Sequence, residues 1–106
     1  MPSTAPLPTR IKETESDQKS KLAPLWKVLL HNDDKTTMEF VIMVLMQFFG
    51  HELEAAMEIM LNVHKTGLGI AGVYPREIAE LKQEQTVSAA RTQKYPLVVT
   101  IEPVEK

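Results

Sequence analysis

The sequence predicts a small α+β domain in which three helices pack on one face of a three-stranded antiparallel sheet. Short segments with alternating apolar side chains and longer segments with helical spacing follow one another in the order β-α-α-β-α-β. A chain of 106 residues can bury one hydrophobic core. We therefore expect a core domain over residues 25–106, preceded by a flexible arm over residues 1–24.

The arm has the composition of a disordered segment. It carries mixed charges and no aromatic residue, so it buries too little apolar area to offset the entropy lost on ordering. It also has no apolar stretch of the kind found in a secretory signal. Four prolines interrupt it, namely Pro2, Pro6, Pro8 and Pro24.

The first strand and the first helix flank a polar turn. Residues 25–30 place Trp26, Val28 and Leu30 on one side, which predicts a strand. Residues 38–49 are apolar around most of a helical circumference and end before Gly50, so we expect a helix that is buried on more than one face and has a left-handed C-cap. Thr36 or Thr37 would cap its N-terminus.

The next helix and strand are predicted over residues 53–66 and 68–74. The helix ends before Gly67, and its apolar stripe is expected to comprise Leu53, Ala56, Met57, Met60, Leu61 and His64. The strand contains Gly69 and Gly72, which indicate a close backbone approach or a bulge.

A third helix is expected from Pro75 to about Gln93, with Ile78 and Leu81 facing inward. Residues 95–102 predict the last strand, and Leu97, Val99 and Ile101 share its inner side.

Composition excludes several classes of function. A net charge of −2 gives no field that would hold nucleic acid or an anionic membrane, and the absence of cysteine excludes disulfides and thiolate sites. The longest apolar run, residues 38–49, is too short to span a bilayer. No activated nucleophile, phosphate loop or closely spaced metal-ligand pair is present. We expect a monomeric, cytoplasmic protein that is not an enzyme and has no metal or other cofactor.

The most informative feature is the polar cluster between the first strand and the first helix. Asn32, Asp33 and Asp34 offer amide and carboxylate oxygens directly before a run of apolar residues. This pairing suits a ligand with a cationic head and an apolar body, although a capped strand-to-helix turn alone would explain the same residues. His64 is equally compatible with a core histidine that bonds a backbone group.

Five blocks in the same order resemble the ClpS family, the adaptors of the bacterial Clp ATP-dependent protease. The resemblance covers residues 26–102 and lies in Asn32-Asp33-Asp34 with Thr36, in residues 38–41, 60–64 and 72–74, and in Pro96-Leu97. It implies an adaptor for N-degrons, which are proteins recognised by their free N-terminal residue. The first residue would be Leu, Phe, Tyr or Trp. The adaptor would hand these proteins to the N-terminal domain of a ClpA-like or ClpC-like AAA+ unfoldase.

The resemblance also assigns residues. The α-amino group would be bound by Asn32 and His64 with help from Asp33, while Asp34 would support the loop. Met38 would act as a gate against β-branched first residues. Glu77 and Lys82 would face the unfoldase, and the arm would be the segment offered to it. The pocket for the first side chain would comprise Thr36, Met38, Val41, Met60, Val63 and Leu97.

The chain departs from the family pattern at two loop positions. Lys35 stands where an aromatic residue is common and Thr37 where proline is common, which affects the contact to the second substrate residue and the rigidity of the loop. The alternative to an N-degron adaptor is a protein-interaction domain of ribosomal-stalk-like fold that ignores free N-termini.

Overall fold

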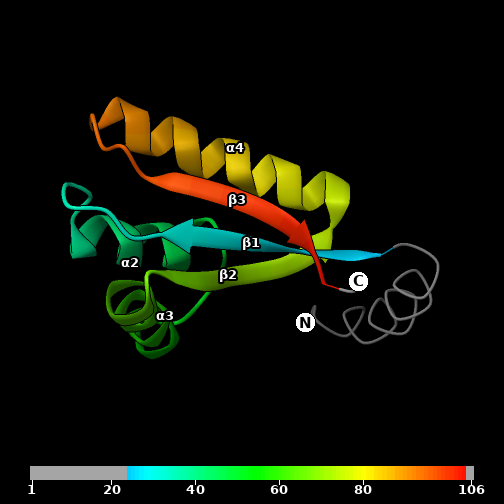
Figure 1. Cartoon of the computed structure of the whole chain (residues 1–106), viewed down its shortest axis with the longest axis horizontal. Coiled ribbons are helices and arrows are strands. Elements are labelled where there is room, and N and C mark those ends of the chain that lie inside the picture. Colours follow the sequence, from blue (N-terminus) through cyan, green and yellow to red (C-terminus); the bar gives the residue numbers. More distant parts are fainter. Residues whose placement is uncertain (1–23, 105–106) are drawn as a thin grey trace, which may run out of the picture.

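The computed structural model describes residues 24–104, and its elements follow the predicted order (Figure 1). The predicted arm lies outside the described residues, apart from Pro24. The strands and helices are β1 (Leu25–His31), α2 (Met38–Gln47), α3 (Leu53–Thr66), β2 (Leu68–Pro75), α4 (Arg76–Thr92) and β3 (Val98–Pro103).

The sheet is antiparallel throughout, and its strand order is β2-β1-β3. Val28 of β1 pairs with Gly72 of β2, but the next residue, Leu29, pairs with Ile70, so Ala71 is the extra residue of a bulge. A ring nitrogen of His51 forms a hydrogen bond of 2.6 Å with the carbonyl oxygen of Ala71. This carbonyl of the edge strand therefore has a partner at the bulge. The bulge predicted from the glycines of this strand is confirmed.

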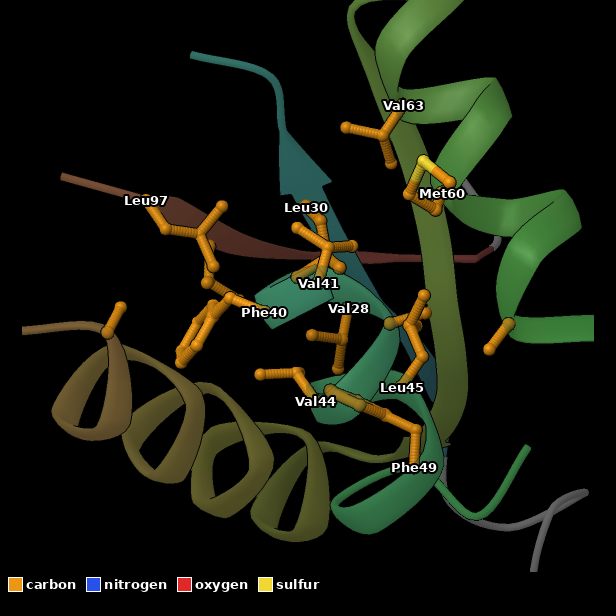
Figure 2. Packing of buried hydrophobic residues seen from close by; sticks show 14 of the residues in the cluster. Val28, Leu30, Phe40, Val41, Val44, Leu45, Phe49, Met60, Val63 and Leu97 are labelled. Atoms are coloured by element: carbon orange, nitrogen blue, oxygen red, sulfur yellow. The ribbon is translucent and has the colours of Figure 1, made fainter. Parts of the chain in front are cut away.

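All three helices pack on one face of the sheet. Val28 and Leu30 of β1 are fully buried, and they share one cluster with buried residues of α2, α3 and α4 (Figure 2). On the other face, Lys27 forms a salt bridge of 3.3 Å with Glu102, and the described helices leave this face open. The same face carries the half-exposed side chains of Leu68, Ile70, Val73 and Val98.

Helix α2 begins at the polar turn and runs through the core. Thr37 is its N-cap, and its hydroxyl accepts a hydrogen bond of 3.1 Å from the Phe40 N–H. The helix ends at Gln47, two residues before the predicted end, and the chain leaves through Gly50 at φ +74°. The expected left-handed C-cap is not found, because the C-cap is Phe48 in a right-handed conformation and the left-handed Gly50 follows two residues later.

The buried stripe of α3 differs from the predicted one. Ala56, Met60 and Val63 are buried, whereas Leu53, Met57 and Leu61 are each at least 42% exposed. Helix α3 packs mainly on α2 and the outer strand β2, so a narrow stripe suffices to cover the contact. The predicted end of the helix at Gly67 is confirmed by its left-handed φ of +98°.

The inner face of α4 was also predicted wrongly. Ile78 and Leu81 are 40% and 49% exposed, and the buried residues of this helix are Ala79, Thr86 and Ala90. The small side chains of Ala79 and Ala90 allow the axis of α4 to approach the sheet closely. The larger side chains of Ile78 and Leu81 then remain at the surface. The helix begins at Arg76, with Pro75 as its N-cap rather than its first residue.

The helices of the described part, residues 24–104, are all too short or too polar to cross a membrane.

Candidate functional site

A hollow of about 380 Å³ opens between the loop after β1, the start of α2 and the end of α3. One part of its lining is polar, and we call the residues Asn32, Asp33, Asp34 and His64 the polar mouth. The other part consists of Val41, Met60 and Val63, with Met38 at its rim, and we call these residues the apolar wall. Lys35, Thr36 and Thr37 complete the lining.

Asp33 holds the shape of the loop. One of its carboxylate oxygens accepts hydrogen bonds of 2.7 Å from the backbone N–H groups of Lys35 and Thr36. The other oxygen accepts a bond of 2.7 Å from the Thr36 hydroxyl. These bonds are the Asx-turn pattern that Asp favours in turns. Asp33 can still accept from a ligand, because a carboxylate has more lone-pair sites than these three bonds use.

The same bonds set the ionisation of Asp33. Partial burial acts to raise the pKa of this carboxyl, but the hydrogen bonds from Thr36 and Lys35, together with the charge of Arg91, lower it below its ordinary value of 3.8. Asp33 is therefore a carboxylate at neutral pH. A fixed negative charge consequently stands at the polar mouth.

The end of α3 brings His64 to Asn32. The backbone N–H of Asn32 donates to the carbonyl oxygen of Gly67 at 2.9 Å, which ties the start of the loop to the C-cap of α3. His64 lies in the last turn of that helix, and both it and Asn32 are exposed. Partial negative charge at the C-terminus of the helix favours a cation here. The mouth therefore offers an amide oxygen, an imidazole and carboxylates to a cationic group.

The apolar wall is continuous with the hydrophobic core. Val41, Met60 and Val63 are only 6%, 7% and 4% exposed, and they lie on facing parts of α2 and α3 (Figure 2). Gly69 allows this packing, because a Cβ there would lie 2.8 Å from a methyl carbon of Val63. Met38, in contrast, is 44% exposed at the rim of the hollow.

Two assignments change in the structure. Leu97 is not among the residues that line the hollow; it is 1% exposed and packs in the core (Figure 2). The bonds that support the loop come from Asp33, whereas Asp34 is exposed and accepts none of them. The sequence alone does not decide which of the two adjacent aspartates accepts these bonds. Lys35 and Thr37 were not predicted to line the hollow, but they do.

The two residues expected to face an unfoldase lie on α4. Glu77 is exposed in the first turn, and Lys82 is half-buried one turn further on. The Lys82 ammonium donates to the Phe48 carbonyl at 2.6 Å and lies 5.7 Å from the centre of the Tyr74 ring. Because an ammonium has three donors, Lys82 can bind the end of α2 and still contact a partner.

Within residues 24–104, no group of three histidine or acidic side chains is arranged to hold a metal ion. The hollow thus has the donors for a cationic head and the surface for an apolar body. Its polar residues are all supplied by one loop and one helix end.

Known proteins share this arrangement of sequence and fold. The family model described as "ATP-dependent Clp protease adaptor protein ClpS" matches residues 21–100. The chain belongs to the ClpS family. The ClpS proteins are adaptors of the Clp protease and not proteases themselves, so this chain is a Clp protease adaptor.

Individual relatives agree with the family match. A ClpS adapter from Aromatoleum aromaticum is 49% identical over 90 residues, which cover 85% of this chain and 87% of the relative. The ClpS adapter of Desulfatibacillum aliphaticivorans is 50% identical over 90 residues, which cover 85% and 86% of the two chains. Agrobacterium tumefaciens ClpS2, solved with bound L-phenylalaninamide, matches with a TM-score of 0.74 and 34% identity and covers 76% of this chain and 98% of its own.

Proposed function

We propose that this ClpS-family chain binds the free α-amino group and the bulky first side chain of N-degron proteins that begin with Leu, Phe, Tyr or Trp. It then delivers them to a ClpA-like or ClpC-like AAA+ unfoldase for degradation. The observation that supports this most strongly is the joining of the polar mouth and the apolar wall in one hollow of about 380 Å³.

The polar mouth fits an α-amino group. The reference pKa of such a group is about 7.7 to 8.0, so at pH 7 most of it is an ammonium with three donors and no acceptor. The amide oxygen of Asn32, a ring nitrogen of His64 and the carboxylate of Asp33 could accept these donors. Acetylation removes the charge and all but one of the donors. Binding should therefore depend on a free N-terminus.

The apolar wall fits the first side chain. Burying a Leu or Phe side chain contributes about 1.5 to 3 kcal/mol, and hydrogen bonds to a charged group contribute about 1.5 to 3 kcal/mol each. After the costs of association, micromolar or somewhat tighter binding is a reasonable magnitude. Met38 at the rim would gate the hollow against the branched Cβ of Ile and Val.

The ligand of the Agrobacterium protein supports both assignments. L-phenylalaninamide has a free α-amino group, a benzyl side chain and an amide where the next peptide bond of a protein would be, and it is bound to that ClpS2. The same three features define the end of a protein that begins with Phe. The present hollow offers groups for the first two.

Delivery would use a different part of the molecule. Glu77 and Lys82 lie on α4, which contributes no residue to the hollow. An unfoldase domain bound there would leave the hollow accessible. The arm before β1 would be the segment that the unfoldase engages.

Fluorescence anisotropy tests the proposal with three labelled peptides. One begins with Leu, the second is the same peptide acetylated at its α-amino group, and the third begins with Ala. We expect micromolar or tighter binding of the free Leu peptide alone. Equal binding of the acetylated peptide would contradict amine recognition. No binding of any peptide would contradict N-degron recognition by this hollow.

A further inference from the structure

We infer that Lys35 makes this adaptor prefer substrates with an acidic second residue and disfavour those with a basic one. This inference rests on the proposed function, because it concerns the residue that follows the bound N-terminus. Lys35 lines the hollow, is exposed, and is the only lysine or arginine among the eleven lining residues.

The position of the second residue follows from the two halves of the hollow. The Cα atom of the first residue bears both the amine and the side chain, so it must lie between the polar mouth and the apolar wall. The wall is closed by the core, with Val41 and Val63 only 6% and 4% exposed. The peptide can continue only past the exposed rim. Its next Cα lies about 3.8 Å further on.

The rim is formed in part by the loop that carries Lys35. The backbone N–H of Lys35 is held by Asp33 at 2.7 Å, which fixes the base of the side chain. Neither of the two salt bridges found within residues 24–104 involves Lys35, so the ammonium has no ionic partner there. A four-carbon stem lets this charge reach a side chain that passes over the rim.

Asp34 is the neighbouring charge that would oppose the effect. Its side chain is short, and it is also exposed at the polar mouth. Lysine extends further from the backbone than aspartate does. We therefore expect the field at the second side chain to be set by Lys35.

The test compares peptides that differ only in the second residue, namely Leu-Glu, Leu-Gln and Leu-Lys, each labelled at the far end. The readout is the ratio of the Kd of the Leu-Lys peptide to that of the Leu-Glu peptide. For an exposed ion pair and its like-charge counterpart, we expect a ratio of about two to ten at low salt. The ratio should approach one near 1 M salt, where the Debye length is about 3 Å.

Three variants identify the residue responsible. Lys35→Gln should bring the ratio close to one, and Lys35→Glu should invert it. Lys65→Gln is the matched control, since Lys65 is an exposed lysine next to His64 that does not line the hollow, and it should keep the wild-type ratio. Thermal unfolding of each variant checks the fold, which Lys35 supports only through its backbone.

The outcomes separate this inference from the proposed function. If the Leu-Gln peptide binds but the ratio is one or lower in the wild type, the role of Lys35 is wrong and N-terminal recognition stands. A ratio that persists in Lys35→Gln also overturns it. If the Leu-Gln peptide does not bind at all, the proposed function and this inference both fail.

Discussion

The polar mouth and the apolar wall differ in how firmly the fold holds them. Asn32 and His64 are exposed, whereas Val41, Met60 and Val63 are at most 7% exposed and belong to the core cluster. The wall residues therefore stabilise the domain and also offer a surface to a ligand. Asn32 and His64 can be changed with little loss of stability. Mutations in the two halves should consequently separate folding from binding.

The largest effect is expected in the wall. Met60→Ala should lower the free energy of unfolding by about 2 to 5 kcal/mol, because it removes a buried side chain and leaves a cavity. Met57→Ala is the matched control, since Met57 lies on the same helix but is 42% exposed, and it should cost less than about 0.5 kcal/mol. Denaturant unfolding measures both. Equal stability of the two variants would show that the wall is not part of the core.

Substitutions in the polar mouth should weaken peptide binding and leave stability almost unchanged. His64→Ala and Asn32→Ala should each weaken binding of a Leu-initiated peptide by about ten- to a hundredfold, because each removes a hydrogen bond to a charged group. Their melting temperatures should stay close to that of the wild type. The backbone bond from Asn32 to Gly67 survives the substitution.

His51 provides the control for His64. Its ring bonds the Ala71 carbonyl at 2.6 Å, and it does not line the hollow. His51→Ala should lower stability by about 1 kcal/mol and leave peptide affinity unchanged. Anisotropy and thermal melts distinguish the two histidines. Normal peptide binding by His64→Ala would remove this residue from the site.

A substitution of Asp33 should affect both binding and stability, because this residue belongs to the polar mouth and also holds the loop. Asp33→Asn should cost about 1 kcal/mol at pH 7, since an amide cannot replace the carboxylate in all three of its hydrogen bonds. The folded-state pKa of Asp33 is lowered, so its stabilising contribution is present above the ordinary value of 3.8 and is lost as the pH falls through the folded-state value.

A pH series of unfolding measurements tests this assignment. The difference in stability between the wild type and Asp33→Asn should be constant from pH 7 to about pH 5 and should shrink at lower pH. A difference that grew on acidification would mean that the carboxyl pKa is raised rather than lowered in the folded protein.

The smallest effect on stability is expected at the rim. Met38 is 44% exposed, so Met38→Ala should change the free energy of unfolding by less than about 1 kcal/mol. If Met38 acts as the gate, the variant should gain affinity for Ile- and Val-initiated peptides while retaining Leu-initiated ones. Anisotropy with the three peptides measures this change. Unchanged discrimination would assign the gate to another residue.

The sequence predicted the element order, which depends on local pattern, and the resemblance to ClpS named most of the residues that line the hollow. Alternation placed Val28 and Leu30 on the inner face of β1, and the block from Asn32 to Met38 marked the loop and the helix start. The inner faces of α3 and α4 were mispredicted. Apolar periodicity does not reveal which of two neighbouring stripes on a helix meets the sheet. In α4, the small residues Ala79 and Ala90 are among those that are buried.

The remaining differences at the site depend on tertiary contacts. Leu97 is apolar like the residues of the apolar wall. The packing around the start of β3 nevertheless buries it in the core. That Asp33 rather than Asp34 accepts the hydrogen bonds of the loop depends on which carboxylate the turn directs toward the N–H of Thr36. Adjacent identical residues give no local pattern that would decide between them.

The most direct test is an NMR titration of the ¹⁵N-labelled protein with a Leu-initiated peptide and its N-acetylated form. The account predicts that the free peptide shifts the backbone amides of residues 32–38 and 60–67 and leaves most of α4 (Arg76–Thr92) unchanged. The acetylated peptide should shift few of them. Shifts concentrated on α4 or on the open face of the sheet, or equal shifts with both peptides, would contradict recognition of a free N-terminus at the polar mouth and the apolar wall.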